Sequence, residues 1–143
     1  MFRLVWVAIL SSFLAAGSTE DEIMDLREYI SEITKSCMKK FEVSMEDYDR
    51  ANKNKDFSGI DACFFGCLLK DKGLIDDKGM FNEKIGYEIA EKFIKSPEDR
   101  ASIKKISETC KSVNEQAVSD GEKGCERAVL LVQCLYDNNS KVM

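Results

Sequence analysis

Six cysteines constrain this chain more than any other feature, because their spacing limits which segments can be joined. They are separated as C-x25-C-x3-C-x42-C-x14-C-x8-C. An even number of cysteines behind an apolar N-terminal run predicts a disulfide framework. On helices, Cys63 and Cys67 share one face, one turn apart, whereas Cys125 and Cys134 point to opposite sides, so neither pair can easily bond to itself. Ten of the 15 pairings contain neither pair, and we expect bonds between different helices.

Residues 1–17 have the pattern of a signal peptide. A single early positive charge, Arg3, precedes an apolar run that ends in the small residues Ala15, Ala16 and Gly17. This run is too short and wrongly flanked for a membrane span, and we expect cleavage after Gly17 or Ser18. No second long apolar run follows. We therefore predict a secreted, extracellular protein with no stable membrane insertion and one domain over residues 18–143.

Charge and composition argue against several classes of function. The net charge of −5 becomes −6 once Arg3 is removed with the leader, and there is no basic cluster, which argues against nucleic acid as a partner. Histidine is absent, so the chain lacks the most common general base and metal ligand. The cysteine spacing has no paired C-x2-C elements. We predict a protein that is not an enzyme and uses no metal or cofactor.

The rest of the pattern predicts an all-α domain. There is a single proline and no β-type alternation, and capping signals divide the chain into helices. Six helices are expected: one from the signal Thr19-x-x-Glu22, then Ser44 to Asn52, Ile60 to Lys70, Asn82 to Lys95, one from Ser96-Pro97, and the last from Ser119-x-x-Glu122 to Tyr136.

Two of these helices have an apolar face that the cysteines do not occupy. The segment 128–136 is apolar at eight of nine positions, so it is expected to be buried nearly all round. Its third apolar side carries Leu131 and Leu135, which must face either packed core or a cavity. In the helix from Ile60, Phe65 and Leu69 lie opposite the cysteines in the same way.

The six-cysteine pattern, with x3 between the second and third cysteines and x8 between the fifth and sixth, resembles that of the insect odorant-binding proteins. This family includes the pheromone-binding and general odorant-binding proteins, and the likeness spans essentially the whole mature chain. The resemblance implies a compact six-helix domain with three interlocked disulfides enclosing an apolar cavity. The implied pairs are Cys37–Cys67, Cys63–Cys125 and Cys110–Cys134.

The resemblance also implies where a ligand lies. In the family, residues two before and two after the third cysteine and one after the sixth line the pocket, which agrees with the helix faces above. Several members carry a Ser or Thr hydroxyl, which can hold a ligand's polar head, at the positions of Leu69 and Leu74. Because this chain has leucine at both, Tyr136 and Ser107 are the remaining polar candidates. The predicted ligand-binding residues are Ile30, Phe65, Leu69, Leu74, Phe81, Leu131, Leu135 and Tyr136, with Phe93 and Ile106 as weaker candidates.

The function that the resemblance implies is that of a secreted carrier, a monomer or weak homodimer. It would bind and solubilise small hydrophobic ligands such as odorants or pheromones, with a membrane odorant receptor as a further partner. One alternative is a saposin-like lipid-interacting protein, although its initial C-x2-C pair is missing. Another is a protein signal or venom component of the same fold that binds no small molecule. A phospholipase A2-like enzyme would require histidine.

Overall fold

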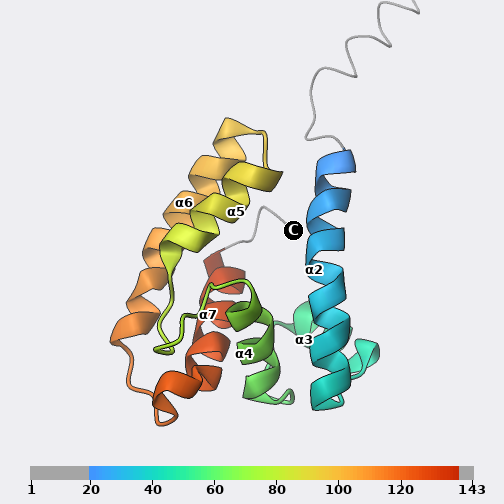
Figure 1. Ribbon diagram of the computed structural model, residues 1–143, viewed down its shortest axis with the longest axis vertical. Helices are drawn as coiled ribbons and strands as arrows, with labels where there is room; N and C mark the ends of the chain where they lie inside the picture. The colour runs from blue at the N-terminus through green and yellow to red at the C-terminus, as the bar shows by residue number, and fades with distance from the viewer. Residues whose placement is uncertain (1–19, 139–143) are drawn as a thin grey trace, which may run out of the picture.

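The computed structural model describes the backbone of residues 20–138 and the side chains of residues 28–138. Within that range the chain folds into six α-helices, and the all-α prediction is confirmed (Figure 1). The predicted leader and the tail after residue 138 lie outside the described residues. The helices are α2 (Glu20–Phe41), α3 (Met45–Asn54), α4 (Ala62–Asp71), α5 (Glu83–Phe93), α6 (Pro97–Cys110) and α7 (Cys125–Asn138), with short 3-10 helices η1 (Lys111–Glu115) and η2 (Gly121–Lys123) before α7.

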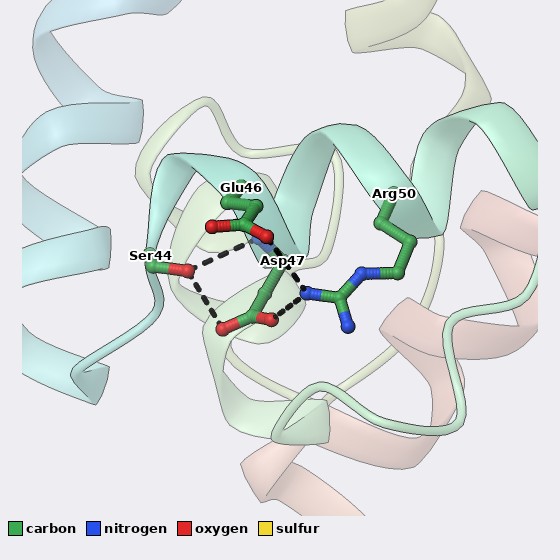
Figure 2. A network of polar contacts seen from close by, with 4 residues as sticks. All are labelled: Ser44, Glu46, Asp47 and Arg50. Atoms are coloured by element: carbon green, nitrogen blue, oxygen red, sulfur yellow. Dashed lines mark hydrogen bonds and ion pairs between the residues drawn. The ribbon is translucent and has the colours of Figure 1, made fainter.

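Local capping chemistry fixes the start of α3 as predicted. Ser44 accepts a hydrogen bond from the Asp47 backbone N–H at 3.1 Å, and its hydroxyl donates to the Asp47 carboxylate at 2.7 Å. Figure 2 shows this cap, with Arg50 pairing with both Asp47 and Glu46. These charged side chains are exposed, so the ion pairs contribute little, and the cap itself is what defines the helix start.

The predicted start of the last helix is wrong by five residues, because the signal at Ser119 places the first helical residue at Asp120. α7 begins at Cys125 because Gly124 adopts a left-handed conformation, with φ of 70°, just before it. The capping acceptor is Asp120, whose carboxylate accepts from the backbone N–H groups of Cys125 at 2.8 Å and Glu126 at 3.1 Å. Ser119 instead donates its backbone N–H to the Glu126 carboxylate at 2.7 Å. A side chain five residues upstream thus takes the place of the predicted cap.

The three disulfides join the helices in the pairing that the family resemblance implied. Cys37–Cys67 ties α2 to α4, Cys63–Cys125 ties α4 to α7, and Cys110–Cys134 ties α6 to α7. No free cysteine remains among the described residues. Helix α4 therefore has covalent links to helices on two sides, while α5 is held by packing against α6 and, near its end, against α2.

Helices α4 and α7 approach each other closely at Gly66. A Cβ added there would lie 3.4 Å from the Cα of Cys125, which is van der Waals contact and leaves little room for a side chain larger than a methyl group. The Cα atoms of Cys63 and Cys125 are only 4.5 Å apart. This contact places the apolar faces of both helices in one core that includes Phe64, Phe65 and Leu131.

A buried arginine, which the sequence analysis missed, attaches α7 to two loops. Arg127 is 6% exposed and donates to the carbonyl oxygens of Gly79 at 2.9 Å, Gln116 at 3.2 Å and Val113. Gly79 itself has φ of 76°, and a Cβ there would lie 2.3 Å from the carbonyl oxygen of Gly121. The guanidinium thus holds the turn after α4 and the η1 segment against α7 through backbone carbonyls.

Candidate ligand-binding site

Seven of the eight predicted wall residues lie in or against one hydrophobic cluster. Three of them are buried within it, Phe65, Phe81 and Leu131, and four are half-buried at its edge, Leu69, Leu74, Leu135 and Tyr136. The weaker candidate Ile106 also packs against this cluster. Ile30 is the exception, because it is 46% exposed and lies outside the cluster.

The buried members form a floor of packed side chains. Leu131 is 0% exposed and Phe65 is 2% exposed. The ring of Phe65 packs against Phe57 at 5.4 Å and against Phe64 at 5.2 Å between ring centres. Phe57, which is buried, also contacts the ring of Tyr136 at 5.1 Å. Among the predicted wall residues, the accessible surface therefore lies on the half-buried ones.

Phe57 was not among the predicted site residues. It lies between α3 and α4, in a stretch predicted as a polar loop, where it is the one large apolar side chain of residues 52–59. The sequence pattern that could have indicated its burial is a single aromatic residue within an otherwise polar loop. Loop residues of this kind are buried only when the tertiary structure provides a partner, here Phe65 and Tyr136.

Tyr136 links α7 to α3 through its hydroxyl group. The hydroxyl donates to the side-chain oxygen of Asn52 at 2.7 Å. Burial raises the pKa of Tyr136, with a further contribution from the charge of Tyr48, so the hydroxyl stays protonated at neutral pH. The predicted polar anchor is therefore already engaged within the protein.

We expect Tyr136→Phe to separate a structural role from a ligand-binding role. The change removes one hydrogen bond and leaves the Asn52 oxygen without this donor, which should lower the free energy of unfolding by about 1 kcal/mol. Affinity for an apolar probe should change less than about twofold. Urea denaturation and probe titration measure the two effects. A large loss of affinity at unchanged stability would instead assign the hydroxyl to the ligand.

The segment between α4 and α5 positions Leu74 and Phe81. Ile75 and Phe81 form an isolated antiparallel bridge, and the Asn82 N–H donates to the Leu74 carbonyl at 2.8 Å. The amide of Asn114 accepts from the Phe81 N–H at 2.7 Å and donates to its carbonyl at 3.0 Å. These two hydrogen bonds hold Phe81 in the core, so the loop has a defined position against the hydrophobic cluster.

Leu74 meets the second polar candidate, Ser107, over Gly86 of α5. A Cβ added to Gly86 would lie 3.5 Å from the Ser107 hydroxyl oxygen and 3.7 Å from a Leu74 methyl group. Ser107 is buried. The three residues come from different elements, so this contact joins the loop after α4 to the α5–α6 pair.

Two open hollows on the described surface contain none of the predicted wall residues. One, of about 690 Å³, overlies the Cys37–Cys67 and Cys63–Cys125 bridges and is lined by charged residues that include Lys40, Lys70 and Lys123. The other, of about 390 Å³, lies between α5 and α6 beside Tyr87 and Arg100. Both hollows are open to solvent, whereas the sequence analysis expected an enclosed cavity, and the predicted wall remains a prediction.

Among the side chains of residues 28–138, no three acidic or cysteine groups gather as a metal site would require. Over residues 20–138, none of the helices combines the length and apolar character needed to cross a membrane.

Over the described residues, six helices, three interlocked disulfides and a central apolar cluster define a small disulfide-bonded helical domain. The model of the PBP/GOBP family matches residues 20–138, and the chain belongs to this family of pheromone-binding and general odorant-binding proteins. Members of the family are binding and carrier proteins, not enzymes. No curated protein matches the chain.

Proposed function

We propose that the protein is a secreted carrier that binds and solubilises small hydrophobic molecules, such as odorants, pheromones or similar signals. The observation that carries this proposal is the PBP/GOBP match over residues 20–138, together with the three disulfides. The ligand would lie against the half-buried edge formed by Leu69, Leu74, Leu135 and Tyr136, above the floor formed by Phe65 and Leu131.

The binding energy would come mainly from burial of apolar surface. A ligand that buries roughly 150–300 Å² gains on the order of 4–7 kcal/mol at about 25 cal/mol per Å². The entropy lost on immobilisation reduces this gain, so affinities near micromolar are expected. The disulfides support this mechanism because they hold α2, α4, α6 and α7 together without requiring a completely filled core.

The proposed setting is extracellular fluid. A leader over residues 1–17 and three disulfides with no free cysteine among the described residues both favour an oxidising compartment. We propose a monomer or weak homodimer that delivers its ligand to a membrane odorant receptor.

Probe binding tests the carrier function directly. The apolar dye N-phenyl-1-naphthylamine should bind the purified protein with micromolar affinity and a rise in fluorescence. Leu135→Asp should abolish this signal, because a carboxylate at the wall must either be buried without a partner or bring water with it. Gln133→Glu, on the polar edge of α7, is the matched control and should bind normally. No dye binding by the unmodified protein would refute the carrier.

A second candidate is a secreted protein of the same fold that binds no small molecule. The burial of Phe65 and Leu131 favours it, because side chains of the protein itself fill the space between α4 and α7. The same dye titration decides between the two, since this candidate predicts no saturable fluorescence change.

We expect dye binding to change less than about twofold between pH 7.5 and 5.5. Histidine, the usual switch in this range, is absent. A hydrogen bond from Ser58 lowers the pKa of Asp56 below 3.8, so its contribution to stability is lost only below that pH. A hydrogen bond to Glu83 raises the pKa of Lys111 above 10.5, so its contribution is lost only above that pH. Fluorescence titration measures the effect.

Loss of binding is expected only below about pH 5, where ordinary carboxylates begin to accept protons. A sharp drop in affinity centred at pH 6 to 6.5 would contradict this prediction and require a carboxylate with a strongly raised pKa.

A further inference from the structure

Two lysines converge on one aromatic pair where α2, the end of α4 and α5 meet. The ring centres of Tyr29 in α2 and Phe93 in α5 are 4.8 Å apart. The Lys72 ammonium, just after α4, lies 3.4 Å from the centre of the Tyr29 ring, and the Lys92 ammonium of α5 lies 5.4 Å from the same centre. Lys92 is also 5.0 Å from the Phe93 ring centre. Two positive charges therefore share a single small region.

Among residues 28–138, whose side chains the structure describes, carboxylates neutralise these two charges poorly. The Lys72 side chain is only 17% exposed, yet its one ion-pair partner among the described residues is Asp71, at 3.9 Å and half exposed. Such an exposed contact at the distance limit is weak. Lys92 forms no ion pair within the part of the chain that the structure describes, and its ammonium lies over the two rings. An ammonium offers three hydrogen-bond donors, so donors remain for an anion.

The turn that carries Lys72 begins and ends at proposed wall residues. The Leu74 N–H donates to the Leu69 carbonyl at 2.9 Å, so the chain doubles back around Lys72 and Gly73. Gly73 has φ of 76°, which favours glycine in this turn. Lys72 thus lies between two leucines of the wall, neither of which has a hydroxyl group to hold a neutral polar head.

We propose that Lys72, assisted by Lys92, binds the anionic head of an amphipathic ligand whose apolar chain lies along Leu69 and Leu74. The preferred ligands are therefore long-chain carboxylates, rather than the corresponding neutral alcohols. The local positive charge is what selects them, because the chain as a whole carries a net charge of −5 and would otherwise repel an anion. This inference rests on the proposed carrier function and names the class of ligand.

Competition between matched ligands tests the proposal. Dodecanoate and 1-dodecanol, which share a chain length, should displace N-phenyl-1-naphthylamine at pH 7.5 with a preference of about tenfold for the carboxylate, as expected for one charge-assisted contact. Added NaCl should weaken displacement by dodecanoate only. Lys72→Met should abolish the preference, so that the two ligands displace the dye about equally, and should leave the affinity for 1-dodecanol unchanged.

Lys84→Met is the matched control, because Lys84 is on the same helix as Lys92 but is exposed and pairs with Glu88 at 4.0 Å. It should retain the preference. Equal displacement by the two ligands in the unmodified protein would overturn the anion site while leaving the carrier intact. Equal losses of both ligands in Lys72→Met would overturn it too, by assigning Lys72 a structural role.

The same measurements distinguish failure of the anion site from failure of the carrier function. Absence of any dye signal would refute the carrier itself. Sedimentation with phosphatidylglycerol vesicles, without competition by dodecanoate, would assign the two lysines to a lipid surface and overturn the proposed free ligand.

Discussion

Leu131→Asp is expected to unfold the protein, or to lower its free energy of unfolding by at least about 4 kcal/mol. Leu131 has no exposed surface and lies in the core between α7 and α4. Truncation of such a leucine alone costs about 2–5 kcal/mol through the cavity that it leaves. The unpaired carboxylate adds several kcal/mol more. Domains of this size are stable by only about 5–15 kcal/mol, so most of the stability would be lost. Circular dichroism during urea and thermal unfolding measures the change.

Gln133→Glu, two residues further along α7, is the control for this experiment. The Gln133 amide donates to the Asp137 carboxylate at 3.0 Å, and the substitution places two like charges one helical turn apart. That arrangement should cost only a few tenths of a kcal/mol. If Leu131→Asp instead remained folded with a comparable small loss, Leu131 would have to face accessible space, and the packed floor described here would be incorrect.

Features that depend on neighbouring residues could be predicted from the sequence. The caps at Ser44 and Ser96 are local hydrogen bonds to residues three positions away, and both form as expected. The apolar faces of α4 and α7 follow from helical periodicity, which is why Phe65 and Leu131 were correctly expected to lie away from the disulfides in core or cavity. The disulfide pairing needed more than periodicity, since geometry alone left ten arrangements open.

Features that depend on distant partners could not be predicted in the same way. Arg127 is buried only because carbonyl groups 11, 14 and 48 residues away converge on it. The start of α7 depends on whether Asp120 or Ser119 supplies the cap, and the conformation of Gly124 decides in favour of Asp120. The Lys72 and Tyr29 contact likewise joins two elements whose sequences show no sign of it.

Removal of the Cys63–Cys125 bridge is expected to destabilise the protein more than removal of either other disulfide. This bridge spans 62 residues, against 30 for Cys37–Cys67 and 24 for Cys110–Cys134. If a cross-link acts by restricting the unfolded chain, the double substitution Cys63→Ala and Cys125→Ala should cost about 4 kcal/mol. The two shorter bridges should each cost about 0.6–0.8 kcal/mol less.

Urea denaturation of the three double-alanine variants measures this order, with Cys110→Ala and Cys134→Ala together as the matched control, because that pair also involves α7. An equal loss of unfolding free energy in all three variants would contradict this explanation. It would mean that each bridge stabilises the folded state through its own packing and not by restricting the unfolded chain. The Cys63–Cys125 variant should also lose dye affinity, because this bridge is the covalent link between α4 and α7, the two helices that carry Leu69 and Leu135 of the proposed wall. Retained dye affinity in a folded Cys63–Cys125 variant would show that packing between α4 and α7, including the close contact at Gly66, holds the two helices together without this bridge.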